Sequence, residues 1–420
     1  MRHLFFNAFL LAACSPSEPI LELQEEVLLA QLRWDDSPAT DPTNAFFQSE
    51  KAQVFGRELF YDSRLSQNEK QSCGSCHVPE LGFADGLLLA EGAGVAARHT
   101  PSLLSVARQE WYLWDGGCDS LWCQSVGPME NPSEMAFTRG ELAHLLFDDE
   151  QYKRSYEDLF GPMPPMDDSS RFPDIARPNW SDEESVEHVS WMSMQQEDRE
   201  ALNRVLTNAT KALGAFQGRI ERVLSPFDVF ANAVVEGDPL GQVLYDPEAL
   251  KGFRLFVGKA GCVRCHSGPL FSNGGFSNAG VGDREWLTEP DEGRIEGVLD
   301  VLENPFNAAG VFSDDPMGPR AKRLIDLSPE PEMLGSFKIP TLRNVALSPP
   351  YMHGGQLASL SEVLEHYSTL VESPREGETD SCLQPLELTQ DESTQIVAFL
   401  ESLTGVWLDP WVLPPDDWEP

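Results

Sequence analysis

The stretch KAGCVRCHSGPL (residues 259–270) places two cysteines and a histidine within five positions of a chain that has eight cysteines in 420 residues. A second stretch, KQSCGSCHVPEL (70–81), repeats the same Cys-x-x-Cys-His pattern. Two thiols one helical turn apart can each form a thioether with a haem vinyl group, and the next residue then offers its imidazole to the iron. The pattern predicts two covalently bound haem c groups. The residues concerned are Cys73, Cys76 and His77, and Cys262, Cys265 and His266.

Three other readings of these cysteines compete with haem attachment. A four-cysteine zinc site would leave both following histidines unexplained. A redox-active dithiol pair usually lies in a βαβ context, which this sequence lacks. Structural disulfides are the third alternative. The repeated histidine favours haem over all three.

The composition is that of a globular protein, with 41% hydrophobic and 23% charged residues. The formal net charge is −38. So much negative charge makes nucleic acid and anionic membrane surfaces unsuitable partners, and it favours a basic protein or a neutral small molecule.

The first residues, MRHLFFNAFLLAAC, combine a positive start, a short apolar run and small residues before Cys14. This arrangement indicates a lipoprotein-type signal peptide over residues 1–13, so that Cys14 becomes the acylated first residue of an exported, periplasmic protein. Residues 14–45 are acidic and rich in proline, and we expect them to form a tether. A lipid anchor is then the only expected membrane contact.

The patterns that follow predict a mainly α fold of two cytochrome c-like haem domains with long irregular loops, over residues 46–240 and 241–410. Short helical patterns containing Gly-x-x-Leu-Phe precede each pentad, at 52–62 and 247–258. Longer helices are expected at 198–224, spanning the junction, and at 389–405, where Thr389 is the N-cap. Residues 161–196 are expected to be an irregular insertion.

Two further segments carry a specific resemblance. YLWDGGCDSLWCQSVGPMENPSEM (112–135) and FKIPTLRNVALSPPYMHGGQLASLSEVLEHY (337–367) resemble segments of the bacterial di-haem cytochrome c peroxidase family, which includes the MauG-type enzymes. The resemblance extends from about residue 45 to about residue 405 and implies an N-terminal haem that reacts with peroxide and a C-terminal haem that passes electrons to it.

For the N-terminal haem, the resemblance implies that His77 is the proximal ligand and that Glu134 is the acid–base group that moves a proton between the peroxide oxygens. Gln124 would orient peroxide, Pro128 would shape the pocket, and Trp114 would relay electrons between the haems. Read without the family, Glu134 in NPSEM is part of an ordinary helix start with Asn131 as its cap.

For the C-terminal haem, the resemblance implies that His266 is the proximal ligand. The distal ligand in this family lies fourteen positions after the histidine of Tyr-x-His-x-Gly, here His353, which points to Tyr367 and to the MauG-like branch. Met352 is the competing candidate. His353 itself matches the inter-haem histidine, and Arg343 is expected to pair with a haem propionate.

The sequence departs from the family at three places. No histidine lies between His77 and His99, and Glu91 stands where relatives carry a histidine that blocks the peroxide haem, so we expect an open site. His99 replaces an asparagine that helps to bind calcium in relatives together with carbonyls matching Ser348 and Pro350, which leaves a calcium ion possible.

The third departure is a glycine, Gly117, in place of an arginine, accompanied by Cys118 and Cys123. These two cysteines are candidates for a disulfide, whereas Cys382 has no expected role.

The leading hypothesis is a peroxidase that reduces hydrogen peroxide to water with electrons from a small redox protein, either a cytochrome c or a cupredoxin. One alternative is a MauG-like enzyme that oxidises residues of a partner protein. Another is a non-catalytic di-haem electron carrier, for which Glu134 and Gln124 would be superfluous.

Overall fold

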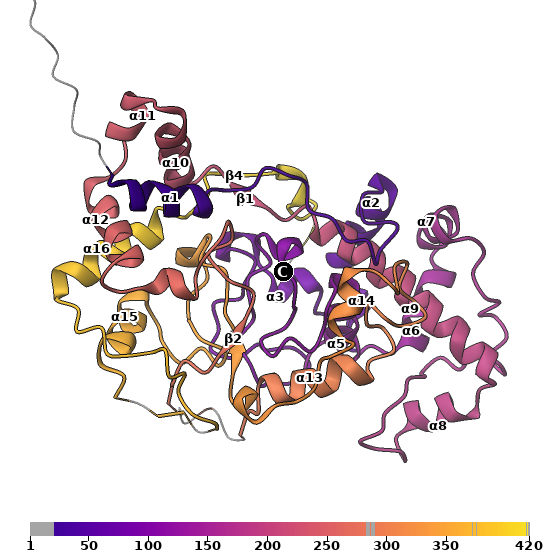
Figure 1. Cartoon of the computed structure of the whole chain (residues 1–420). Coiled ribbons are helices and arrows are strands. Elements are labelled where there is room, and N and C mark those ends of the chain that lie inside the picture. The colour runs from indigo at the N-terminus through magenta and orange to yellow at the C-terminus, as the bar shows by residue number, and fades with distance from the viewer. Residues whose placement is uncertain are drawn as a thin grey trace, which may run out of the picture.

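The computed structural model describes residues 21–282, 286, 290–371, 373–374, 376–416 and 418. These residues form a mainly helical protein with long irregular loops, as the sequence predicts (Figure 1). The α-helices are α1 (Leu23–Leu32), α2 (Glu50–Phe60), α3 (Cys73–Cys76), α4 (Leu121–Gln124), α5 (Val126–Glu130), α6 (Arg139–Asp148), α7 (Glu150–Phe160), α8 (Val186–Ser193), α9 (Gln196–Gln217), α10 (Pro226–Glu236), α11 (Pro239–Val243), α12 (Pro247–Val257), α13 (Arg294–Glu303), α14 (Pro319–Arg323), α15 (Leu360–Thr369) and α16 (Gln390–Glu401). No helix of the described residues is both long and apolar enough to cross a bilayer.

The described strands are short and join segments that lie far apart in the sequence. They are β1 (Arg222–Val223), β2 (Phe276–Ser277), β3 (Phe337–Lys338) and β4 (Trp407–Leu408). β1 pairs antiparallel with β4, and β2 pairs antiparallel with β3, so that Phe276 lies opposite Lys338.

Two hydrophobic cores are built on the same helix pairing. In the first core α2 packs on α9, and in the second α12 packs on α16. A Cβ at Gly56 would lie 2.0 Å from the carbonyl oxygen of Ala212, and one at Gly252 would lie 1.9 Å from that of Gln395. Each glycine of the Gly-x-x-Leu-Phe pattern therefore permits two helix backbones to touch.

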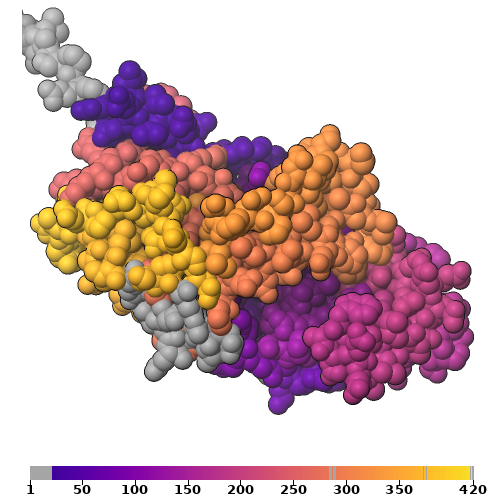
Figure 2. All heavy atoms as spheres, turned by 60° about the horizontal axis from the view of Figure 1, so that its bottom comes forward, coloured from indigo at the N-terminus to yellow at the C-terminus, as the bar shows by residue number. Residues whose placement is uncertain are grey.

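Each end of the chain packs in the core that the opposite half of the chain mainly forms. Helix α1 buries Leu29 and Leu32 in the second core, and Val412 near the C-terminus is buried in the first. The Tyr61 hydroxyl donates a hydrogen bond to the Val412 carbonyl at 2.7 Å. Figure 2 shows the indigo α1 segment at the same end of the molecule as the yellow α15 and α16.

The expected tether at 14–45 is therefore wrong from residue 21 onward, because this segment packs against the protein. Residues 1–20, including Cys14, lie outside the described residues. The division into domains at residue 240 stays a prediction, and the crossing ends mean that neither core is formed by one continuous half.

Several local predictions can be compared with the helices directly. Thr389 caps α16 as expected, its hydroxyl accepting from the Glu392 N–H. Helix α9 ends at Gln217 rather than continuing to residue 224, and it closes the first core instead of spanning a junction. The expected irregular insertion at 161–196 contains helix α8.

Candidate functional site

Both Cys-x-x-Cys-His pentads open onto one cavity of about 1240 Å³. This volume exceeds the ~300–1,000 Å³ of a usual single-ligand site. The structure brings most of the expected site residues to its wall. They are Cys76, His77, His99, Trp114, Gln124, Pro128, Glu134, Cys262, Cys265, His266, Arg343, Ser348, Pro350, Met352, His353 and Tyr367. Cys73, on α3, instead packs against the first core, and its thiol is free like those of the other pentad cysteines.

The two pentads place their histidines in the same way. The backbone N–H of His77 donates to the Cys73 carbonyl at 2.9 Å, and that of His266 donates to the Cys262 carbonyl at 2.8 Å. The Nδ1 atom of His77 lies 2.9 Å from the carbonyl oxygen of Phe83, and that of His266 lies 2.9 Å from that of Phe271. Burial lowers the pKa of both imidazoles. Nδ1 is therefore the protonated nitrogen in each ring, and Nε2 is left free to bind a metal, as haem iron requires.

The repeat also extends to loops that follow the pentads, and this part of it was missed in the sequence. Tyr112 and Tyr351 begin equivalent loops, each closed by an isolated antiparallel bridge, to Cys118 in one and Leu357 in the other. The next residue has a left-handed φ in both loops, 65° at Leu113 and 73° at Met352.

Ser120 and Ser359 then cap the following helices, α4 and α15, at equivalent positions. In this alignment Trp114 corresponds to His353, the two residues expected between the haems.

The same alignment relates two residues that follow the Ser120 and Ser359 caps and line the cavity. Pro128 in the first half occupies the position of Tyr367 in the second, because each lies eight residues after its helix cap. A proline side chain has no atom that can bind iron, whereas a phenol oxygen can. Were each histidine to hold a haem iron, Tyr367 could supply a further ligand in the second half, whereas Pro128 could supply none in the first.

Tyr367 lies on α15 with Leu360, Val363 and Leu364, which all line the cavity. Burial raises the pKa of its phenol. The phenol is therefore neutral until a cation such as ferric iron binds its oxygen. Met352 also lines the cavity, but in the loop beside His353 rather than at the repeat position.

Glu134 is held in place by two hydrogen bonds, one to its side chain and one to its backbone. Its Oε1 accepts a hydrogen bond from the Asn131 amide at 2.7 Å, and its backbone carbonyl accepts from the Ala93 N–H at 2.7 Å. Burial raises the pKa of the carboxyl group, while the Asn131 bond opposes that rise. Residues 131–135 form a turn, so the helix start read from NPSEM is wrong. The sequence did not reveal the role of Asn131.

Gln124 ends α4, and its Oε1 atom is buried without a hydrogen-bond partner among the described residues. Buried amide oxygens are normally paired, because leaving one unpaired costs about 1–3 kcal/mol. The orphaned oxygen lines the cavity with Glu134 and His77. It suits a small ligand that donates a hydrogen bond.

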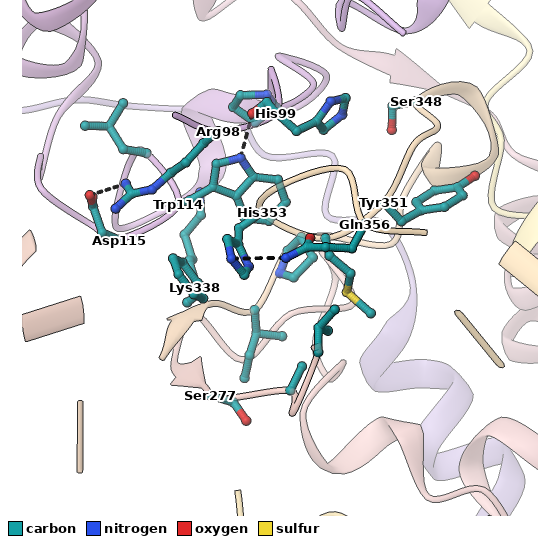
Figure 3. Close-up of a pocket in the computed structure, with 18 of the residues that line it drawn as sticks. Arg98, His99, Trp114, Asp115, Ser277, Lys338, Ser348, Tyr351, His353 and Gln356 are labelled. Carbon is teal, nitrogen blue, oxygen red and sulfur yellow. Dashed lines mark hydrogen bonds and ion pairs between the residues drawn. The ribbon is translucent and has the colours of Figure 1, made fainter. Parts of the chain in front are cut away.

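Trp114 and His353 meet where the two halves of the cavity join (Figure 3). The Trp114 Nε1–H donates to the His99 carbonyl at 2.8 Å, and the His99 N–H donates to the His353 carbonyl at 2.8 Å. The His353 ring stacks on Phe337 with centroids 3.6 Å apart, and burial lowers its pKa to about 4. His353 is therefore a neutral ring between the halves.

The expected role of Arg343 is not supported by its contacts. Its guanidinium forms an ion pair with both Asp228 oxygens, at 2.8 and 3.0 Å. It also donates to the Pro269 and Leu32 carbonyls, and its side chain is 3% exposed. These bonds use four of the five guanidinium N–H groups and pair the charge with Asp228, so Arg343 joins segments of the second core and offers no unpaired charge to a propionate.

We expect Asp228→Ala to lower the free energy of unfolding by about 3–5 kcal/mol, because it leaves the buried Arg343 charge without its carboxylate. Urea denaturation measures the loss. Asp158→Ala removes a carboxylate from the exposed Lys51 ion pair and should cost below about 1 kcal/mol. Equal losses in the two variants would contradict the structural role of Arg343.

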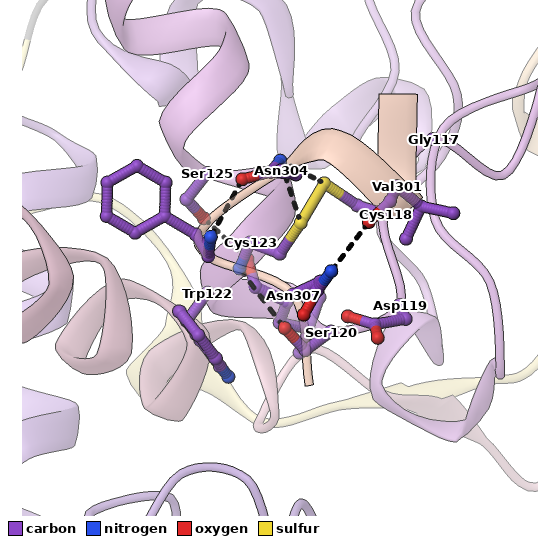
Figure 4. Close-up of a disulfide and its surroundings, with 12 residues drawn as sticks. Gly117, Cys118, Asp119, Ser120, Trp122, Cys123, Ser125, Val301, Asn304 and Asn307 are labelled. Atoms are coloured by element: carbon purple, nitrogen blue, oxygen red, sulfur yellow. Dashed lines mark hydrogen bonds between the residues drawn. A yellow bond between two sulfur atoms is a disulfide. The ribbon is translucent and has the colours of Figure 1, made fainter. Parts of the chain in front are cut away.

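The expected disulfide between Cys118 and Cys123 is present (Figure 4). Both cysteines are buried, and the Asn304 amide of the segment after α13 approaches their sulfurs at 3.9 and 3.5 Å. The bridge fixes the loop that connects Trp114 to Gln124. Cys382 is free and exposed.

Removing the bridge with Cys118→Ala and Cys123→Ala should lower the free energy of unfolding by about 2 kcal/mol, the value expected for so short a closed loop. The urea midpoint of the oxidised protein measures this change, with Cys382→Ala as the control that leaves the bridge intact. Coincident midpoints for wild type and double variant would show that the bridge adds no stability.

Comparison with known proteins places this geometry in a family. The family described as "Di-haem cytochrome c peroxidase" matches residues 50–235. The methylamine utilization protein MauG of Methylorubrum extorquens is 30% identical over 352 residues, covering 83% of this chain and 77% of that protein.

Two peroxidases are also similar. Cytochrome-c peroxidase IdrP1 of Denitromonas iodatirespirans is 28% identical, covering 84% of this chain and 81% of its own. Cytochrome c551 peroxidase of Nitrosomonas europaea is 26% identical, covering 96% and 88%.

Solved structures share the fold. A MauG-like protein associated with microbial copper homeostasis superposes with a TM-score of 0.61 at 22% identity, covering 92% of this chain and 98% of its own. The diheme peroxidase BthA from Burkholderia thailandensis gives 0.61 at 20% identity, covering 88% and 90%. Taken with the cavity and the paired histidines, these similarities show that the chain is a peroxidase-type enzyme with two haem groups, a member of the di-haem cytochrome c peroxidase and MauG family.

Proposed function

We propose that this enzyme reduces hydrogen peroxide to water at a haem held by Cys73, Cys76 and His77. Electrons from a small cytochrome c or cupredoxin would enter through a second haem, held by Cys262, Cys265 and His266, with Tyr367 as its distal ligand. The observation that carries the proposal is that Glu134, the unpartnered Gln124 oxygen and His77 all line one cavity. The thioether bonds make both groups permanent.

The chain's own residues account for the proton transfers. A haem, when bound, supplies one-electron redox chemistry. The Glu134 carboxylate accepts a proton from one peroxide oxygen and returns it to the other, so that the departing oxygen leaves as water. Gln124 Oε1 accepts a hydrogen bond from the peroxide and orients it. Two electrons from the donor protein and two protons from solution then convert the remaining oxygen into the second water.

The open character of the first site is supported by the loop that carries Glu91. This loop is fastened to the Glu134 segment, with the Gly94 N–H donating to the Ser133 carbonyl at 3.0 Å. A Cβ at Gly92 would lie 2.5 Å from the Glu134 carbonyl oxygen. The loop presents no imidazole to the cavity, so peroxide reaches the site without a prior reduction step.

The decisive experiment is electron paramagnetic resonance of the resting ferric protein, followed by peroxide consumption with a reduced small cytochrome. We expect one high-spin and one low-spin haem signal, and two electrons used per peroxide. Two low-spin signals, or no response to peroxide, would overturn the proposal.

A MauG-like activity on a partner protein is the second candidate. The tyrosine at position 367 favours it, because an anionic oxygen ligand lowers the potential of a haem relative to a methionine sulfur. A crosslinked or hydroxylated partner protein would support this activity, whereas steady turnover with a reduced cytochrome supports the first. An electron carrier without catalysis has no use for the Glu134 and Gln124 pair.

Two finer expectations complete the proposal. Export to the periplasm with a lipid on Cys14 rests on the sequence of residues 1–20. A calcium ion near His99 has weaker support, because the His99 Nδ1 lies 2.8 Å from the Leu87 carbonyl and burial lowers the pKa of its ring. A neutral imidazole is a poor ligand for calcium.

A further inference from the structure

Lys338 is a half-buried cation at the junction of the two halves of the cavity (Figure 3). It belongs to β3, and its backbone N–H donates to the Trp114 carbonyl at 2.7 Å. Its ammonium group donates to the Gln109 side-chain oxygen and to the Trp111 carbonyl, the latter at 3.2 Å. Both acceptors are neutral.

No described carboxylate forms an ion pair with Lys338, although Asp115 lies close enough to act on it electrostatically. Asp115 is already paired with Arg98, which also binds Asp291 at 2.8 Å. The two other arginines of the cavity wall differ from Lys338 in pairing or in burial. Arg343 is paired with Asp228, and the exposed Arg264 donates to the Gly261 carbonyl.

An ammonium group in this position is expensive to keep charged. Burial lowers the pKa of Lys338 to about 8. Its two neutral acceptors leave one N–H of the three unused. An anion in the cavity would supply both the missing acceptor and the missing charge.

The internal repeat shows that this charge is present on one side only. Lys338 corresponds to His99, and the two make reciprocal bonds across the junction: the Lys338 N–H binds the Trp114 carbonyl, and the His99 N–H binds the His353 carbonyl. His99 is a neutral ring, whereas Lys338 is a cation. The junction is therefore symmetric in its backbone and asymmetric in its charge.

We propose that the Lys338 ammonium binds a propionate carboxylate of a haem seated in the cavity and is the fixed positive charge between the two haems. This inference rests on the proposed di-haem loading. It gives Lys338 the task that the sequence suggested for Arg343.

The test is a redox titration of the di-haem protein and its Lys338→Gln variant. Removing a positive charge near a haem stabilises its oxidised form. We expect the equilibrium constant for reduction of at least one haem to fall about tenfold, which is about 59 mV for one electron. Lys338→Arg should keep the charge and stay within about threefold of wild type. Unchanged potentials in Lys338→Gln would overturn the proposal.

Lys322→Gln is the matched control, since Lys322 is an exposed lysine on α14 and its loss should leave both potentials unaltered. If Lys338→Gln fails to assemble, resonance Raman spectra of Lys338→Arg decide instead. Shifted propionate bending modes would support the contact, and unchanged modes would exclude it. The haem count per wild-type chain is measured first, so that a failure of the di-haem assignment is recognised separately.

Discussion

Glu134→Gln should reduce kcat/KM for hydrogen peroxide by about 10²–10⁴-fold, the usual contribution of one acid–base group. The substitution keeps the Oε1 atom that accepts from Asn131, and removes only the ability to take a proton. Haem content and the absorption spectrum should be unchanged. Stopped-flow mixing with peroxide measures the effect.

Glu296→Gln is a suitable control, because this carboxylate also lines the cavity but its side chain is 56% exposed. It should retain near-normal activity. A Glu134→Gln enzyme that is as fast as wild type would remove Glu134 from the mechanism, whatever its position in the cavity.

The pH dependence of the same reaction follows from the burial of Glu134, which raises its pKa above the usual 4.5. The carboxylate must be ionised to accept a proton, so activity is full above this raised pKa and falls as the pH drops through it. Asn131→Asp replaces the donating amide with a negative charge and should move the acidic limb to higher pH. The pH profile of kcat/KM measures this shift. If the acidic limb of the variant coincides with that of wild type, the limb reports the titration of a group other than Glu134.

Tyr367→Met should raise the reduction potential of the C-terminal haem by a few tenths of a volt, within the ~0.8 V that axial ligands span. A neutral sulfur stabilises ferric iron less than an anionic phenolate does. Potentiometric titration followed in the visible spectrum measures the shift. The change should also favour simple electron delivery over oxidation of a partner protein.

Tyr351→Phe is the matched control. Tyr351 lines the same cavity, and its hydroxyl donates to the Val345 carbonyl at 3.2 Å. Its loss should leave the potential near the wild-type value. If Tyr367→Met and Tyr351→Phe behave alike, the distal ligand is another residue, with Met352 as the first candidate.

The parts of this protein that could be predicted from sequence are those set by local chemistry. The pentads, the Thr389 cap and the helices before each pentad depend on residues within a turn or two of one another. Even there the reason for glycine in Gly-x-x-Leu-Phe became visible only when Gly56 was found against the Ala212 carbonyl.

The errors arise where distant segments meet. The sequence suggests a haem partner for Arg343, because nothing in it reveals the contact with Asp228, which lies 115 positions earlier. The sequence of helix α1 suggests a tether, because the surface that buries Leu29 comes from distant segments of the second core. The alignment that pairs Tyr112 with Tyr351, and therefore Pro128 with Tyr367, rests in part on the left-handed φ of the residue after each tyrosine. Residue types alone do not reveal that conformation.

The exchanged ends of the chain have a consequence for how the enzyme can be divided. A protease that cut once at the exposed α11 would produce two fragments. The N-terminal fragment would keep α1 packed in the second core, and the C-terminal fragment would keep Val412 packed in the first. The two fragments of the cut protein would therefore stay associated. If either fragment were expressed alone, part of its hydrophobic core would be exposed. The two halves of the protein therefore depend on each other for stability and cannot be separated by a single cut.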